Sequence, residues 1–150
     1  MYLALKLAHI LFASLAFGCN LTYAAWFGLG AREPDHLDFA LRGVQFLDDR
    51  ISTPAWWGAG LSGVALVWMG GYPFGLGWIW QSLAAQTLTM VLGLAVNSPL
   101  FKRQIAALRS GGPQDPQFLA LGRRGAALGL VFIGLNLYSL FLMVFKPAGL

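Results

Sequence analysis

The feature that most constrains this chain is a series of four apolar segments, at residues 3–29, 53–69, 78–96 and 125–145. A membrane span needs about 20 such residues, and inside lipid a helix satisfies its own backbone groups. Hydrophobic residues make up 57% of the chain and charged residues only 11%, which lies outside the range of soluble domains. The sequence therefore predicts an all-α, four-helix transmembrane bundle, a single integral membrane domain over residues 1–150 in contact with the lipid bilayer.

The first apolar segment has an alternative interpretation as a secretory signal peptide, with Cys19 at a weak lipoprotein-like cleavage site. The segment continues for ten residues beyond Cys19, which is longer than the usual core of a signal peptide. We therefore expect a retained transmembrane helix. Because Cys19 is the only cysteine, the chain has no intrachain disulfide and no CxxC motif.

Residues 34–50, between the first two spans, have a different pattern. Leu37, Leu41 and Val44 recur at helical spacing, while Asp38 and Arg42 occupy another face. This pattern predicts an amphipathic helix that lies at the membrane surface or extends the second span. After the third span, Asn97-Ser98-Pro99 has the form of a helix cap followed by a proline at the start of a new helix.

The distribution of positive charge predicts the orientation of the chain. Connections 30–52 and 97–124 carry three and five Lys or Arg residues, whereas the turn at 70–77 carries none. Cytoplasmic loops are the ones enriched in Lys and Arg. We therefore expect a multi-pass protein of the bacterial inner (cytoplasmic) membrane with both termini in the periplasm. Since the charges fall between apolar segments and form no single basic face, nucleic acid is not an expected partner.

Ionisable groups inside a span are costly and mark functional sites, and the first span contains two. Lys6 lies about 5 Å from the outer end of its helix, close enough for its amine to reach the interface. His9 lies about 9 Å inside the same end, too deep for a short imidazole to reach water. Ser62, Gln86 and Asn136 fall at about 10 to 14 Å from the outer ends of the other three helices.

The similar depths predict a polar layer with one member on each helix: His9, Ser62, Gln86 and Asn136. It has two interpretations: hydrogen bonding between helices, or the wall of a cofactor or proton site with His9 as the metal-ligand candidate. Small residues add a second prediction, because Gly60, Gly63, Gly125 and Gly129 suit close helix contact within the bundle, in a homo-oligomer or with a membrane partner. The six acidic residues all lie in the two charged connections, which disfavours a carboxylate-based pump.

Three short motifs carry a family resemblance: Lys6-Leu7-Ala8-His9-Ile10, Arg103-Gln104-Ile105-Ala106-Ala107-Leu108 and Leu142-Met143-Val144-Phe145-Lys146-Pro147. The chain resembles an uncharacterised family of small bacterial four-helix predicted integral membrane proteins. More remotely, the pattern of its first helix is similar to the HemJ-type protoporphyrinogen oxidases and to the membrane domain of CopD-type copper-resistance proteins.

The HemJ-type resemblance implies haem b in the bundle, with His9 as the axial ligand and Lys6 beside a propionate. Because the later spans contain no histidine, the haem would be five-coordinate, take a weak ligand such as Met, or be shared by two chains. Oxidase activity does not follow, since HemJ-type proteins carry further ionisable residues on later helices. The rival interpretation is a non-enzymatic membrane subunit or assembly factor, in which the bundle is purely structural.

Overall fold

The computed structural model describes residues 1–147, and these residues form helices and short connections with no strand. In chain order the elements are α1 (Tyr2–Arg32), the 3₁₀ turn η1 (Pro34–His36), α2 (Leu37–Leu47), the π-helical segment η2 (Asp48–Ser52), α3 (Thr53–Met69), α4 (Gly77–Leu92), the π-helical segment η3 (Gly93–Asn97), α5 (Ser98–Gly111) and α6 (Pro116–Phe145).

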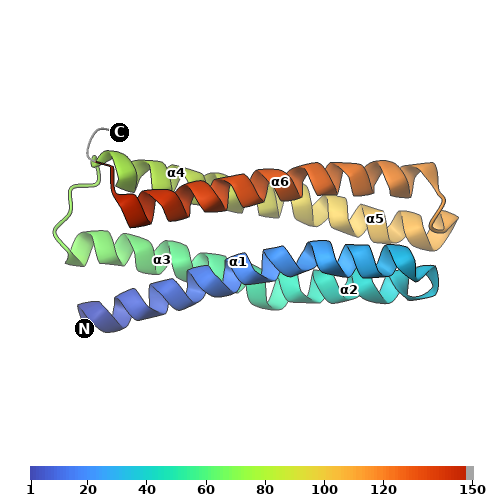
Figure 1. Ribbon diagram of the computed structural model, residues 1–150, viewed down its shortest axis with the longest axis horizontal. Helices are drawn as coiled ribbons and strands as arrows, with labels where there is room; N and C mark the ends of the chain where they lie inside the picture. Colours follow the sequence, from blue (N-terminus) through green and yellow to red (C-terminus); the bar gives the residue numbers. More distant parts are fainter. Residues whose placement is uncertain (148–150) are drawn as a thin grey trace.

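The elements join into four long helical rods that lie side by side (Figure 1). One rod is α1, the second is α2–η2–α3, the third is α4–η3–α5 and the fourth is α6. Both chain ends lie at the same end of the molecule as the α3–α4 connection, and the turns α1–α2 and α5–α6 lie at the opposite end (Figure 1). This arrangement follows from three antiparallel reversals of the chain.

The third rod continues through a position where the sequence predicted a new helix to begin, and in the second rod the helix over residues 34–50 extends the second apolar segment. The expected cap at Asn97 does not end the third rod, because the chain stays helical from Gly77 to Gly111. In each middle rod the π-helical segment is followed directly by a hydroxyl residue and a proline, Thr53-Pro54 or Ser98-Pro99. Proline has no N–H to donate and its ring crowds the carbonyl four residues earlier. A π-helical turn absorbs this disruption without breaking the helix.

Three helices are long and apolar enough to cross a membrane: Tyr2–Arg32, Gly77–Gly111 and Pro116–Phe145. They contain the predicted spans 3–29, 78–96 and 125–145. The fourth predicted span, 53–69, forms α3, which has 17 residues and is not among these three. The 31 residues of α1 extend about 46 Å, well beyond the ~30 Å hydrocarbon core of a bilayer. Helix α1 is therefore longer than a membrane crossing requires.

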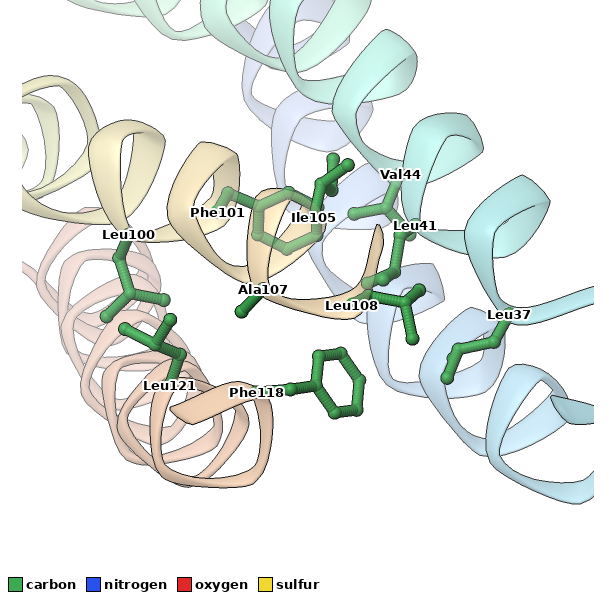
Figure 2. Packing of buried hydrophobic residues seen from close by; sticks show 10 residues of the cluster. All are labelled: Leu37, Leu41, Val44, Leu100, Phe101, Ile105, Ala107, Leu108, Phe118 and Leu121. Atoms are coloured by element: carbon green, nitrogen blue, oxygen red, sulfur yellow. The ribbon is translucent and has the colours of Figure 1, made fainter. Parts of the chain in front are cut away.

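The half of the molecule that holds α2 and α5 has a hydrophobic core like that of a soluble bundle. Leu41 and Val44 on α2 meet Phe101, Ile105 and Leu108 on α5, and α6 adds further side chains (Figure 2). Leu41 and Val44 are each 1% exposed. The outer surface near this core carries charge: Asp38 on α2 forms ion pairs with Arg42 at 2.8 Å and with Arg109 on α5 at 2.9 Å.

The bond from Arg109 holds the pKa of the Asp38 carboxyl below its ordinary value. The small stabilisation from this pair is present above the pKa that Asp38 has in the unfolded chain and is lost as the pH falls through the lower, folded value. Because the groups are exposed, their main effect is to align α2 with α5.

The turn between α5 and α6 has a defined local cause. Gly112 ends α5 with a φ of 79°, a backbone conformation that residues with a side chain rarely adopt. Asp115 then caps α6, because its carboxylate accepts hydrogen bonds from the backbone N–H groups of Gln117 (2.7 Å) and Phe118 (2.9 Å). Pro116 follows at the first helical position, where a missing N–H costs nothing.

Glycines on α3 allow α1 to approach closely. A Cβ built on Gly58 would lie 2.7 Å from the ring of Phe12 on α1, and one on Gly63 would lie 3.1 Å from the ring of His9. Gly125 on α6 lies near Leu100, but a Cβ on Gly129 would meet nothing within 4 Å. The expectation that Gly129 lies at a contact within the bundle is therefore wrong, because α6 turns Phe132 and Leu142 inward and leaves Gly129 at the edge of that face.

A pair of substitutions tests this difference. Gly58→Leu is expected to lower the free energy of unfolding in detergent by about 1–3 kcal/mol, because Phe12 must be displaced from the α1–α3 contact. Gly129→Leu, the matched control, is expected to change it by less than about 0.5 kcal/mol. Equal effects of the two substitutions would contradict the packing described here.

Candidate functional site

The imidazole of His9 lies between α1 and α3. Its Nδ1 atom is 2.9 Å from the backbone oxygen of Ala59 and 3.1 Å from the hydroxyl oxygen of Ser62. Ser62 in turn donates to the backbone oxygen of Gly58 at 2.5 Å. The ring fits here because Gly63 has no side chain at the point of closest approach. The structure thus brings together two of the predicted site residues, His9 and Ser62.

This geometry identifies which ring nitrogen of His9 carries the proton. A carbonyl oxygen can only accept a hydrogen bond, so Nδ1 must be the protonated nitrogen and must donate to Ala59. In a neutral imidazole the lone pair then lies on Nε2. Nε2 has no hydrogen-bond partner among residues 1–147 and is not one of the fully enclosed, unpartnered polar atoms. The lone pair on Nε2 of His9 is therefore unpaired among the described residues, and the atom is not completely enclosed.

The other predicted site residues, Gln86, Asn136 and Lys6, make no hydrogen bond to His9. Gln86 on α4 donates to the backbone oxygen of Trp56 at 3.0 Å, so it bridges α4 and α3 next to Gly60. Asn136 donates to the oxygen of Phe132, one turn earlier in its own helix, at 2.7 Å. Lys6 is exposed, one helical turn before His9. The structure does not join Lys6, Gln86 or Asn136 to His9 by a hydrogen bond.

A partly buried acid, Asp48, was not predicted as a site residue. It begins η2, and the hydroxyl of Tyr23 on α1 donates to its Oδ1 atom at 3.1 Å. Burial raises the pKa of the Asp48 carboxyl, against the lowering effect of the Tyr23 hydrogen bond, and the charge of Asp49 raises it further. The sequence does contain a signal for this position, because Asp48 continues the helical spacing of the buried Leu41 and Val44.

Histidine, cysteine and carboxylate side chains do not gather into a metal-binding cluster in the described part of the chain: no group of three lies together. His36, the second histidine, lies in η1 at the far end of α1 from His9. Any metal held at His9 must therefore take its remaining ligands from a cofactor or another molecule.

These features define the class of the protein: an all-helical integral membrane protein with helices able to span a bilayer and a first-helix histidine that has one free nitrogen. Comparison with family models identifies the family. Residues 3–147 match the family described as "Predicted integral membrane protein (DUF2269)", and the chain belongs to it. No curated protein and no solved structure matches the chain, so these comparisons return neither a HemJ-type nor a CopD-type protein.

Proposed function

We propose that this membrane protein binds haem b and that Nε2 of His9 would hold its iron. The observation that supports the proposal is the lone pair on Nε2, which is not completely enclosed, has no partner among the described residues and lies about 10 Å along α1 from Tyr2. An unpaired polar atom at such a depth in lipid is unfavourable. Coordination to a metal satisfies it.

The chemistry of the donor fits an iron ligand. Ligating histidines usually donate their other ring N–H to a carbonyl or carboxylate, which fixes the tautomer and the ring orientation, and Ala59 supplies such a carbonyl here. Lys6 precedes His9 by three residues, so both side chains lie on one face of α1, where the amine would pair with a propionate. When bound, haem would supply one-electron chemistry.

A haem bound to His9 would lie at the outer surface of α1 and α3. Neither the cavity beside Asp48 nor the groove along α1 near Cys19 includes His9 among its lining residues. The haem would then face lipid or a second copy of the chain, and a second copy would supply a second His9 as the sixth ligand. This chain's part is to hold one ligand nitrogen in place between α1 and α3.

We propose further that α3 is a fourth crossing, so that the molecule forms a four-helix bundle in the bacterial inner membrane. Its 17 residues reach about 25 Å, near the lower limit for a span. The end that holds α2 and α5 would project into the cytoplasm, since eight of the ten Lys and Arg residues lie in its connections. The amphipathic α2 would then pack there with its apolar face on α5, and both termini would be periplasmic.

Cysteine labelling tests this orientation. A membrane-impermeant thiol reagent added from the periplasmic side is expected to label Gly75→Cys, which lies in the exposed α3–α4 connection. It should not label Ser110→Cys at the α5–α6 end until the membrane is permeabilised. The background is Cys19→Ser, which removes the native thiol. The reverse labelling pattern would contradict the orientation and would move His9 to the cytoplasmic leaflet.

The second candidate function is a non-enzymatic membrane subunit or assembly factor. Its supporting observation is that the hydrogen bonds of His9, Ser62 and Gln86 already join α1, α3 and α4 without any cofactor. In that case Nε2 accepts a hydrogen bond from a partner protein or a lipid headgroup. Open small residues such as Gly129 would contact the partner.

Absorbance of the purified wild-type protein separates the two functions. Protein from haem-replete cells is expected to show a Soret band and to contain iron in a fixed ratio to the chain. A colourless preparation without iron would reject the haem proposal and favour the structural subunit.

A further inference from the structure

A small, partly open cavity lies where the two π-helical segments face α1. Its volume is about 40 Å³, enough for a few water-sized particles. Polar side chains reach it from five elements, among them Asn20 on α1, Asp48 on η2, Thr53 on α3 and Asn97 on η3. Thr89 on α4 also lines it, as do Trp56 and Trp57. It is a different site from that of His9, since Trp56 and Ser62 are separated by about 9 Å along α3.

The hydroxyl of Thr89 donates to the backbone oxygen of Ala85 at 2.9 Å, but several other polar groups around this cavity lack partners in the described structure. Tyr23 occupies Oδ1 of Asp48, but Oδ2 accepts no hydrogen bond, and the side-chain amides of Asn20 and Asn97 make none. No Lys or Arg of residues 1–147 forms an ion pair with Asp48, whereas the exposed Asp38 has two. A partly buried carboxylate without a positive partner is unfavourable. The site therefore lacks one positive charge.

We propose that this cavity binds a small monovalent cation, with Asp48 as its charged ligand and the oxygen atoms of Asn20, Thr53, Thr89 and Asn97 as neutral ligands. The carboxylate, the two hydroxyls and the two amides supply oxygen atoms, the donors that hard cations prefer, and the soft sulfur of Met90 is the other side-chain donor in the lining. A single carboxylate balances one positive charge, whereas divalent cation sites usually combine several carboxylates. Na⁺ is the probe that fits the volume and the charge.

The π-helical segments explain why the site lies at this position. Irregular helical turns free backbone carbonyls and are found where a membrane protein lines a cavity or coordinates an ion. Here both segments reach the same cavity, through Asp48 at the start of η2 and Asn97 at the end of η3. The prolines that follow them, Pro54 and Pro99, are thus the sequence feature that shapes the site.

The test measures the melting temperature and the tryptophan fluorescence of the purified full-length protein in detergent. NaCl replaces choline chloride at constant ionic strength, and LiCl and KCl are compared in the same way. We expect a saturable rise in Tm of about 3 °C or more with Na⁺. A parallel change in fluorescence is expected because Trp56 and Trp57 line the cavity. Identical curves in choline and in all three metal ions would overturn the proposal.

A matched pair of variants assigns the response to the cavity. Asp48→Asn is expected to abolish the ion-specific response, while Asp49→Asn, which removes the same charge from the exposed neighbouring position, should keep it. If Asp48→Asn does not fold, Asn97→Ala is expected to raise the Na⁺ concentration at half-response about tenfold. A Na⁺ response that survives Asp48→Asn, or is unchanged in Asn97→Ala, would contradict the site.

The competing explanation for the absence of a positive partner is that Asp48 is protonated and therefore neutral. The titratable groups that face Asp48 are Tyr23 and Cys19 on α1 and Asp49 on η2. A proton and Na⁺ would compete for the same oxygen atoms, so the half-response concentration should rise as the pH falls through the pKa of Asp48. A Tm that depends on pH through Asp48 but not on Na⁺ at any pH would show that the site takes a proton alone and would overturn the cation proposal.

Discussion

Replacing His9 with alanine is expected to abolish the Soret band of the purified protein while the chain still folds. The variant removes the Nε2 lone pair, the proposed iron ligand, and the only other histidine lies in η1 at the far end of α1. It also removes the bond to Ala59, so a modest loss of stability, about 1 kcal/mol, accompanies the loss of haem. Absorbance, iron content and the melting curve are measured on the same sample.

Further variants separate ligation from general damage. His36→Ala is the matched control and should keep the full Soret band. Lys6→Ala should weaken haem retention without shifting the band, because an amine beside a propionate does not touch the iron. Gln86→Ala and Asn136→Ala should have smaller effects than His9→Ala, since their hydrogen bonds go to Trp56 and Phe132 and not to His9. A haem band of wild-type intensity in His9→Ala would reject His9 as the ligand.

Leu41→Ala is expected to have the largest effect on stability, a loss of about 2–5 kcal/mol. Leu41 is 1% exposed and lies in the core that α2, α5 and α6 form together (Figure 2). Truncation leaves a cavity that three helices cannot easily close. We propose that this core lies at the cytoplasmic end. Its side chains would then be exposed to water on unfolding, so the hydrophobic effect stabilises the folded state as it does in a soluble protein. Unfolding by denaturant in detergent measures the change.

The control on the same helix is Phe39→Ala. Phe39 is 62% exposed, so removing its larger side chain should cost less than about 1 kcal/mol. A loss for Leu41→Ala no greater than that for Phe39→Ala would mean that α2 does not pack on α5 in the membrane-bound protein. It would then favour an α2 that lies flat on the bilayer with its apolar face in lipid.

Much of the architecture was predictable because a bilayer restricts what an apolar segment can form. Hydropathy and length alone predicted the helices that contain residues 3–29, 78–96 and 125–145. The position of His9 about two turns into the first helix was also predictable, whereas its depth in a bilayer stays a prediction. The apolar face of α2 was predictable as well, because the helical spacing of Leu37, Leu41 and Val44 places them on one side of the helix whatever that side packs against.

Other features depended on tertiary contacts. The sequence predicted Pro99 at the start of a new helix, whereas the structure continues the helix through it after a π-helical turn, as it also does before Pro54. Two glycines that the sequence predicted alike at helix contacts differ in the structure, since a Cβ on Gly63 would meet His9 and a Cβ on Gly129 would meet nothing within 4 Å in the described residues. Helical periodicity defines which residues share a face, but it does not say which neighbour that face meets.

Asp48 shows the limit most clearly. Its place in a charged connection suggested a solvated residue, because sequence alone assigns a carboxylate to the nearest water. Only the packing of α1 against η2 brought Tyr23 over it and formed the partly open cavity that it shares with Asn20 and Asn97. The sequence by itself determined an all-helical membrane protein with one histidine in its first helix. The tertiary structure decided which nitrogen of His9 has no partner among the described residues and that Asp48 is partly buried, because both depend on contacts between residues far apart in the chain.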